Sequence, residues 1–356
     1  MKRLYVAVSG HGLGHLAQTA PVLNALHTLD PQIEFVVRTA IPRHRLALRL
    51  EFPFEHLAEP ADCNLVMLDA IRADVPASLV AYREFHRDWE ARVAAEARAL
   101  EALRIDAVFS NVGYLPLAAA QQAGLPAAAL CSLNWADIFD HYLGREPGVE
   151  PIRAQIAAAY AGARVFLRPE PSMPMAGLVN TVAIPPVVQA GRYRRAELEQ
   201  KLGLSPGERL VLVGMGGIPY RPPVERWPHR PGVVFLAPDD WQAEHPAVRS
   251  LRETGMVFRD VLASADALVT KPGYGSYAEA AAAGVPVLYI PRPDWPEAPY
   301  LNDWLKAKGR ALEIREEQLL AGDLAEPLAA LWAMPAKPPV AADGAAQAAR
   351  YLLDLR

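Results

Sequence analysis

Two histidines lie in a glycine-rich loop near the N-terminus of the chain. The apolar run 4–9 leads into this loop, and a helical pattern follows directly after its glycines and histidines, Gly10, His11, Gly12, Gly14 and His15. Glycines between a strand and a helix let the backbone come close to a ligand. The helix dipole keeps a histidine at this position neutral and able to accept a proton. His15 is therefore a candidate base, or a residue that only packs on the first turn, while His11 is either catalytic or a solvated loop residue.

The loop does not match a dinucleotide-binding fingerprint. That fingerprint needs a third glycine where this chain has His15, and an acidic residue after the second strand, where it has Arg38 and Thr39. The pattern therefore favours a loop that presents a histidine over a cradle for a nicotinamide cofactor.

A second motif, in the other half of the chain, has the chemistry of a phosphate site. An expected strand ends at Thr270, and the residues that follow it open a short helix: Lys271, Gly273, Tyr274, Gly275 and Ser276. Backbone N–H groups, the positive helix end and a lysine together bind phosphate oxygens. Upstream, Gly214, Gly216 and Gly217 form another glycine turn after a strand. Two such turns in one domain fit a diphosphate held between them.

Glu279 has two possible roles that the spacing leaves open. Ser276 and Glu279 form the pattern Ser-x-x-Glu, which is a capping box and a structural reason for the acid. Next to a phosphate loop, the same carboxylate could instead accept hydrogen bonds from ribose hydroxyls.

Short apolar runs that alternate with helical patterns must position these loops. The expected strands are 4–9, 33–39, 106–111, 126–132, 164–169, 209–215, 232–237, 255–258, 265–270 and 286–290. The expected helices are 15–28, 77–103, 114–123, 243–254, 276–283, 298–308 and 342–356. Such alternation is typical of doubly wound α/β domains with parallel sheets. We expect an N-terminal domain (1–182), a linker (183–195), a C-terminal domain (196–340) and a final helix (341–356).

Composition excludes several classes of protein. The chain has 356 residues, 52% of them hydrophobic, and a formal net charge of −4 without a dominant basic segment, so it shows no footprint for nucleic acid. Cys63 and Cys131 lie in different segments and suggest neither a disulfide framework nor a metal site. The N-terminus shows no signal peptide and no segment reads as a membrane span, so we expect a cytoplasmic protein.

The motifs resemble those of a known family. The run Gly-x-x-x-x-x-Glu-Ala-x-x-x-Gly-x-Pro, from Gly273 to Pro286, resembles the donor-binding segment of GT-B glycosyltransferases. The opening loop is similar to that of the peptidoglycan N-acetylglucosaminyltransferase (MurG-like) group. Segments 9–15, 111–135 and 271–292 resemble the glycosyltransferase-like portion of plant L-arabinokinases. This resemblance implies a GT-B fold, with two Rossmann-like domains facing across a cleft.

The resemblance also implies roles for individual residues. His15 corresponds to the histidine near the reaction centre and Glu279 to the glutamate that binds ribose. Phe258 and Arg259 fall where such proteins hold the nucleobase. Glu297 and Asn302 fall in the segment that reads the donor sugar, although the chain has Ala298 and Pro299 where many relatives carry amides.

The acceptor side carries weaker signals. Asp69 and Asp137 are candidate partners that orient His15, or else solvated or capping carboxylates. Trp135, Phe139 and Tyr142 form either a sugar-stacking platform or ordinary packing at helical spacing.

Together these observations predict a glycosyltransferase without metal or cofactor. It would move a sugar from a nucleotide-diphosphate sugar, of UDP type, to an acceptor hydroxyl. The alternatives are a nucleotide-sugar hydrolase or epimerase on the same fold, and a non-catalytic protein that binds nucleotide sugars.

Overall fold

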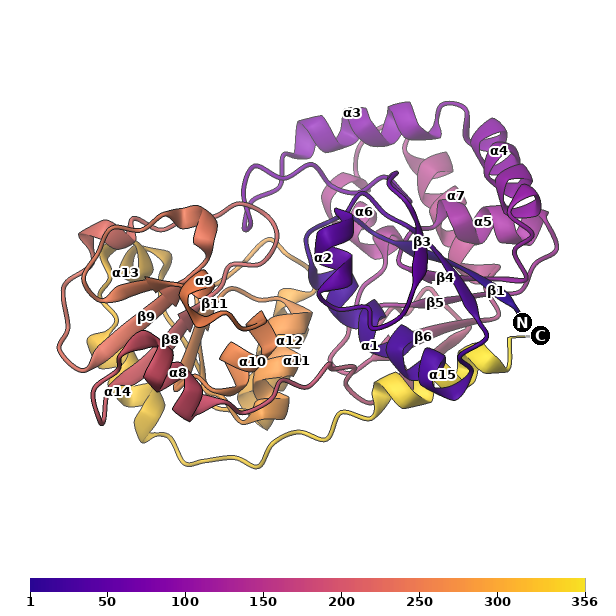
Figure 1. Cartoon of the computed structure of the whole chain (residues 1–356). Coiled ribbons are helices and arrows are strands. Elements are labelled where there is room, and N and C mark those ends of the chain that lie inside the picture. The colour runs from indigo at the N-terminus through magenta and orange to yellow at the C-terminus, as the bar shows by residue number, and fades with distance from the viewer. Residues whose placement is uncertain (356) are drawn as a thin grey trace. The chain divides into compact units, whose positions relative to one another are not determined.

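The computed structural model describes residues 1–355, which divide into two compact units (Figure 1). Unit 1 contains Met1–Leu68, Arg72–Val187 and the chain from Ala342 onward. Unit 2 contains Asp69–Ile71 and Val188–Ala341. The chain therefore enters unit 2 twice and returns to unit 1 near its C-terminal end.

Unit 1 is built on a seven-stranded sheet in the order β3-β2-β1-β4-β5-β6-β7. The strands are β1 (Arg3–Val8), β2 (Glu34–Arg38), β3 (Phe54–Leu57), β4 (Ala107–Asn111), β5 (Ala127–Leu130), β6 (Val165–Pro169) and β7 (Thr181–Ile184). All neighbours pair in parallel. The apolar runs predicted five of these strands, because parallel strands are buried on both faces. The edge strands β3 and β7 are partly exposed and lack that signal.

Helices cover both faces of this sheet (Figure 1). They are α1 (Gly14–Leu29), α2 (Arg43–Ala47), α3 (Val75–His86), α4 (Trp89–Ala102), α5 (Leu115–Gln122), α6 (Trp135–Leu143), α7 (Glu150–Ala161) and α15 (Gly344–Leu353). The single helix predicted over 77–103 is wrong. The backbone leaves the helical region at Asp88 (φ −117°, ψ 44°), a residue type that favours N-cap positions, so two helices form.

Helix α15 completes the core of unit 1. Ala348, Ala349 and Leu352 of this helix are fully buried in the same cluster as Leu16 and Leu23 of α1. The last helix of the chain therefore covers the first one and closes one face of the sheet (Figure 1).

Unit 2 is built on a six-stranded parallel sheet in the order β10-β9-β8-β11-β12-β13. The strands are β8 (Arg209–Val213), β9 (Val233–Ala237), β10 (Val248–Ser250), β11 (Ala267–Thr270), β12 (Val287–Tyr289) and β13 (Ala311–Glu313). The helices are α8 (Arg195–Leu202), α9 (Leu251–Thr254), α10 (Phe258–Ala263), α11 (Tyr274–Ala283), α12 (Ala298–Lys308), α13 (Glu316–Ala321) and α14 (Ala325–Ala333), with short 3-10 turns at Val224–Arg226 and Asp239–Trp241.

Successive side chains of β8 point into two different cores, as a strand buried on both faces requires. Val211 and Val213 join one cluster with Leu328 of α14. Leu210 and Leu212 join another that contains residues of α8, α10, α11 and α12. Together the two units form the predicted pair of Rossmann-like α/β layers.

Two predicted elements of unit 2 are wrong. The run 255–258 is a turn rather than a strand, because Gly255 ends α9 in the left-handed region (φ 58°) and Phe258 begins α10. Most of the predicted helix 243–254 is not helical. Pro246 disfavours a helix there, and Val248–Ser250 pair as β10 with the neighbouring strand β9.

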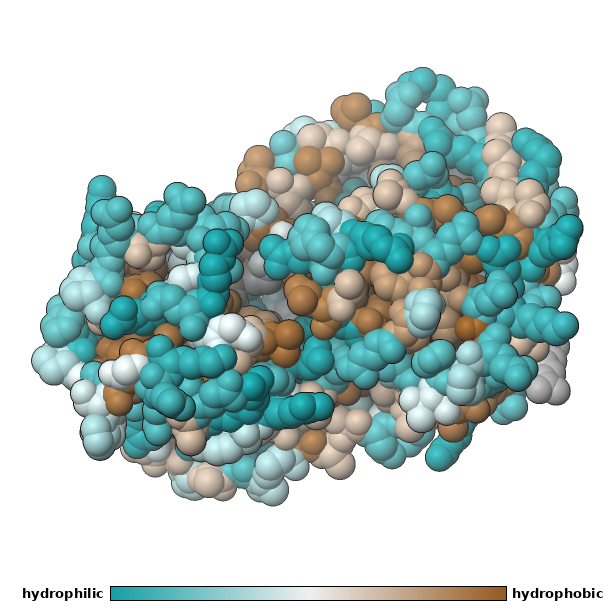
Figure 2. Space-filling model, in the orientation of Figure 1, coloured by the Kyte–Doolittle hydropathy of each residue, from teal (hydrophilic) through white to brown (hydrophobic). Residues whose placement is uncertain are grey.

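On the face drawn in Figure 2, hydrophilic side chains cover most of the surface, with smaller apolar areas between them. Within residues 1–355, no helix has the length and apolar character that crossing a membrane would require.

Candidate functional site

The glycine-rich loop of unit 1 delivers His15 into the first turn of α1. Gly12 has a positive φ (77°), and its N–H donates to the carbonyl of Gly10 (2.8 Å). Helix α1 has neither a side-chain N-cap nor an acidic residue in its first turn. His15 therefore lies at the N-terminus of a helix, as the sequence predicted.

His15 is buried against the ends of two strands. Its Nδ1 lies 2.9 Å from Oδ1 of Asn111, the last residue of β4, and 3.6 Å from Sγ of Cys131, which follows β5. Burial lowers the pKa of His15 to about 4, and the hydrogen bond to Asn111 opposes that shift. The imidazole is therefore neutral at pH 7 and has the protonation state of a base.

Trp135 connects both histidines to a buried acid that the sequence analysis missed. Its ring centroid lies 5.3 Å from that of His11 and 5.9 Å from that of His15. Its indole Nε1 donates to Oδ2 of Asp62 (2.7 Å), which also accepts from the Ser9 hydroxyl (2.6 Å). Burial raises the pKa of Asp62 to about 6. A lone aspartate in a Pro-containing loop carries no motif, so spacing alone could not have identified it.

The expected carboxylate partner of His15 is replaced by the amide of Asn111. Asp137 lies in the first turn of α6, where its carboxylate accepts from Asn134 Nδ2 (2.9 Å) and its N–H donates to Asn134 Oδ1 (2.8 Å). Asp69 belongs to unit 2, where its Oδ1 accepts from the N–H of Ile71 (2.7 Å). Both aspartates thus serve local turns, and a catalytic role for Asp137 stays a prediction.

The three aromatic residues of α6 do not form one stacking platform. Trp135 and Phe139 are 0% exposed, and the ring of Phe139 packs edge-on against Tyr82 (4.9 Å between centroids). Tyr142 contacts His141 instead. The packing interpretation therefore holds for Trp135 and Phe139.

In unit 2 the predicted phosphate site brings both glycine turns to one ammonium group. A Cβ on Gly216 would lie 3.8 Å from Nζ of Lys271, and one on Gly273 would lie 3.9 Å from it. Gly216 has a positive φ (83°) and lies in the exposed turn after β8 together with Gly217. Lys271 follows β11 and lies three residues before the start of α11, so strand ends, a helix start and a lysine come together here. This is the arrangement that the phosphate prediction requires.

The start of α11 excludes one of the two possible roles of Glu279, the capping box with Ser276. The N-cap of α11 is Gly273, and no side chain caps this helix. Ser276 therefore lies inside the first turn and cannot form a capping box with Glu279. Glu279 is buried on α11, as are Tyr274 and Gly275.

Two charged side chains, those of Arg292 and Glu297, lie near the lysine. Burial, together with the nearby charge of Arg292, lowers the pKa of Lys271 to about 7, and Glu297 opposes this shift. The Arg292 guanidinium stacks over the ring of Trp295 (3.8 Å), whose Nε1 donates to Oε2 of Glu297 (3.0 Å). The other carboxylate oxygen, Oε1, is buried without a hydrogen bond among the described residues.

The remaining predicted donor residues have other neighbours. The ring of Phe258 lies 3.2 Å from the position of a Cβ on Gly214, so it packs on the turn after β8. The carbonyl of Arg259 would lie 1.9 Å from a Cβ on Gly191. Asn302 Oδ1 accepts from the Tyr277 hydroxyl (3.1 Å). The structure joins Phe258 to a glycine turn and gives Asn302 a local partner on α11.

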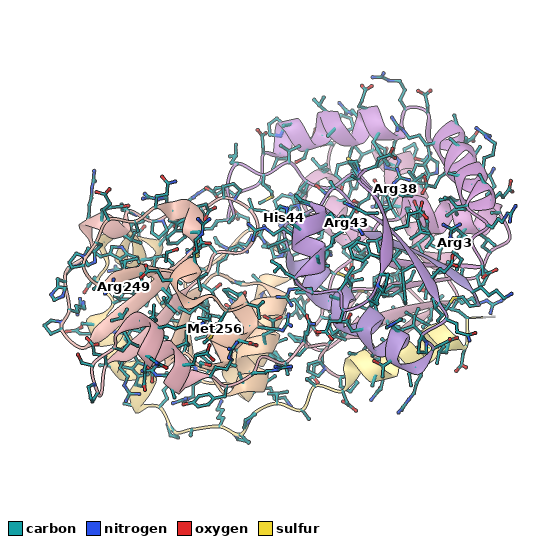
Figure 3. The ribbon with its side chains drawn as sticks, in the orientation of Figure 1. Arg3, Arg38, Arg43, His44, Arg249 and Met256 are labelled. Atoms are coloured by element: carbon teal, nitrogen blue, oxygen red, sulfur yellow. The ribbon has the colours of Figure 1, made fainter. Side chains whose placement is uncertain are left out.

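Arg38, labelled in Figure 3, has a structural role at the end of β2. Its guanidinium pairs with the buried carboxylate of Glu96 on α4, which also accepts from the Tyr5 hydroxyl (2.8 Å). This buried pair accounts for a basic residue where a dinucleotide site would need an acid. Among residues 1–355, no group of three or more His, Cys, Asp or Glu side chains could hold a metal ion.

Comparison with solved structures defines the class of fold. The chain superimposes on CalG4, the calicheamicin glycosyltransferase, with a TM-score of 0.60 (16% identity, covering 100% of this chain and 94% of that one). UGT89C1 of Arabidopsis thaliana, complexed with UDP, gives 0.59 (14% identity, 93% of each chain). MurG of Acinetobacter baumannii gives 0.52 (14% identity, 99% and 100%). The chain has the GT-B glycosyltransferase fold, as predicted.

One curated protein is similar in sequence. L-arabinokinase of Arabidopsis thaliana is 25% identical over 327 residues, which is 88% of this chain. The chain spans only 30% of the length of that relative. This distant similarity confirms the predicted resemblance to L-arabinokinases. No protein-family model matches the chain.

Proposed function

We propose that this protein is a metal-independent glycosyltransferase that acts in the cytoplasm on a nucleotide-diphosphate sugar of UDP type. The observation that carries the proposal is the position of Lys271, whose ammonium lies beside both glycine turns and before the uncapped start of α11. Amides, helix dipole and lysine would together offset the charge of a diphosphate leaving group.

Unit 2 would bind the donor. Lys271, Gly216, Gly217, Gly273, Gly275 and Ser276 would hold the diphosphate, Glu279 the ribose, Phe258 and Arg259 the base, and Glu297 and Asn302 the sugar. Within residues 1–355, Oε1 of Glu297 is buried without a hydrogen bond, which supports a role in sugar binding because such an atom needs a donor. UDP in the UGT89C1 structure supports a uridine nucleotide.

Unit 1 would bind the acceptor and supply the base. The acceptor oxygen forms a bond to the anomeric carbon while the bond from that carbon to the diphosphate breaks. His15 takes the hydroxyl proton, and the nucleoside diphosphate leaves. Its neutral state at pH 7, which burial enforces, supports this role. This chain spans only 30% of the length of the L-arabinokinase. The kinase activity in the name of that protein is therefore no argument for a kinase activity of this chain.

A thermal-shift panel of nucleoside diphosphates and their sugars tests the proposal. We expect UDP to raise the melting temperature of the wild type and of His15→Ala alike. Lys271→Ala should lose most of that shift, because Nζ of Lys271 is the side-chain donor that lies beside both glycine turns. Turnover should be lost in His15→Ala, by about a hundredfold or more, while nucleotide binding is kept.

Incubation with the sugar nucleotide alone separates this proposal from its alternatives. Stoichiometric free sugar without an acceptor would indicate a hydrolase, and an altered sugar still attached to the nucleotide would indicate an epimerase. Tight binding without turnover that survives loss of both His11 and His15 would indicate a binding protein. A panel in which no nucleotide or sugar nucleotide shifts the melting temperature would exclude all of them.

A further inference from the structure

A chain of buried side-chain amides ends on the imidazole of His15. Gln18 Nε2 donates to the Ser132 hydroxyl (2.7 Å), and Asn111 Nδ2 donates to Gln18 Oε1 (3.2 Å). Asn111 Oδ1 then faces Nδ1 of His15 at 2.9 Å. None of these four residues is more than 5% exposed. Bulk water therefore does not compete for these groups, and each bond constrains the next one.

The donor-to-acceptor direction of these hydrogen bonds determines which nitrogen of the imidazole carries the hydrogen. A side-chain amide has one accepting end and one donating end. Because the oxygen of Gln18 faces Asn111, the nitrogen of Asn111 must face Gln18 and its oxygen is left for His15. That oxygen can only accept, so Nδ1 of His15 must carry the hydrogen.

We propose that Asn111 and Gln18 are positioning residues that hold His15 in its Nδ1–H tautomer, which leaves the lone pair of Nε2 as the basic atom. This inference deepens the proposed function on which it rests, since it names the atom that would take the hydroxyl proton. Among residues 1–355, both polar contacts of the His15 ring are made by Nδ1, and Nε2 has no hydrogen-bond partner. If each hydrogen bond ran in the opposite direction, with the Ser132 hydroxyl as the first donor, Asn111 would donate to Nδ1. The hydrogen would then lie on Nε2, and Nε2 could not act as a base.

The other polar groups around His15 do not set its tautomer. Cys131 Sγ lies 3.6 Å from Nδ1, which is a weak sulfur contact beside the 2.9 Å bond to Asn111. His11 and Asp62 are connected to it through the ring of Trp135. Asn111 is neutral, so it orients the imidazole without the charge that would stabilise an imidazolium.

Nitrogen NMR of the full-length protein labelled at its nine histidines tests the proposal without any substrate. His15→Gln assigns the His15 signals. We expect a protonated Nδ1 and an unprotonated Nε2 in the wild type at pH 7. Gln18→Glu should keep this pattern, because a carboxylate accepts from both Asn111 and Ser132. Gln18→Leu should give mixed tautomers, and Thr28→Ala on the same helix should change nothing. A protonated Nε2 in the wild type overturns the proposal.

Asn111→Asp adds a second, independent readout. A carboxylate on Nδ1 would favour the charged imidazole, so the pKa of His15 should rise by about one unit or more in an NMR titration. An unchanged His15 titration in Asn111→Asp means that position 111 does not contact Nδ1 and overturns the proposal.

The same variants separate this inference from the proposed function. If the function is wrong and the tautomer right, no variant consumes a sugar nucleotide, yet the nitrogen spectra follow the expected series. If the tautomer is wrong and the function right, the wild type consumes the donor while Nε2 is protonated. With both right, Gln18→Leu lowers kcat severalfold and leaves the KM for the nucleotide sugar unchanged.

Discussion

Asp62 shows how a single residue can be costly to the fold that contains it. This residue is 7% exposed. The two groups that donate hydrogen bonds to its carboxylate, those of Ser9 and Trp135, both donate to the same oxygen, Oδ2. The other oxygen, Oδ1, is buried without a hydrogen bond among the described residues. An ionised carboxylate with one unsatisfied oxygen destabilises a folded protein. Its place beside Trp135, which contacts both histidines, suggests that it serves the site rather than stability.

This cost predicts a pH-dependent effect of Asp62→Asn. Burial raises the pKa of Asp62 from an ordinary 3.8 to about 6, so the folded state binds a proton that the unfolded state has lost between these values. The contribution of Asp62 to the free energy of unfolding is therefore greatest below pH 4 and falls as the pH rises from 4 through 6. Asp62→Asn, which has no charge, should be more stable than the wild type by roughly 2 kcal/mol at pH 7.5 and by little at pH 4.

Urea unfolding of both proteins across this pH range measures the difference. Glu51→Gln, at an exposed position of the same unit, is the control for loss of one negative charge. An Asp62→Asn protein that is less stable than the wild type by the same amount at every pH would show that the charge costs nothing.

At the residue scale, motifs found some site groups and not others. His15 and Lys271 follow glycine turns next to strand ends, and that context is visible in the sequence. Asn111 and Gln18 are ordinary polar residues on a strand and a helix. Their connection to His15 depends on which strands are neighbours, and β1 and β4 are neighbours only in the folded sheet.

At the scale of elements, the residue at which a helix begins determines whether a nearby serine caps that helix. A serine that caps a helix stabilises it by about 1 kcal/mol. Ser276 lies within the helix, whereas Ser250 caps α9 in a true capping box with Glu253. The two serines therefore form a matched pair in the same unit.

We expect opposite results from the two alanine variants. Ser250→Ala should lower the free energy of unfolding by about 1 kcal/mol and leave UDP binding unchanged. Ser276→Ala should change stability by less than about 0.5 kcal/mol and weaken UDP binding severalfold, because in the proposed site its hydroxyl would donate to the diphosphate. Chemical denaturation and calorimetric titration with UDP give the two numbers. Equal loss of stability in both variants would contradict the position of the helix start.

The elements also show where sequence patterns lose their information. Central strands such as β1 and β8 are buried on both faces, so nearly all of their residues are apolar and the sequence predicts them. The run 255–258 is also largely apolar, yet Gly255 ends α9 there in the left-handed region. Short apolar runs beside glycine fit either a strand or a helix boundary, and only packing in the sheet decides between them.

At the scale of the whole molecule, unit 1 depends on the return of the chain after unit 2. Val187 and Asp343 pair as an isolated antiparallel bridge, and the N–H of Gly344 donates to the carbonyl of Pro186 (3.2 Å). A Cβ on Gly344 would lie 2.0 Å from the carbonyl oxygen of Pro185. Only glycine fits at the point where α15 begins.

Gly344→Ala should therefore destabilise unit 1 without affecting nucleotide binding in unit 2. The clash with a backbone atom should cost about 1–3 kcal/mol. Gly177→Ala, also in unit 1, is the matched control because a Cβ there meets nothing within 4 Å. Thermal unfolding of the full-length variants, with and without UDP, measures both effects. Equal melting temperatures for the two variants would contradict the close approach at Gly344.

The late position of α15 has a consequence for how the protein is made. A ribosome releases residues 188–341 of unit 2 before it releases the helix that covers α1. The second unit can thus finish its sheet during synthesis, while the first one waits with the apolar side of α1 uncovered. During that interval a nascent chain would present the surface on which chaperones act, at the unit that was translated first and completes its fold last.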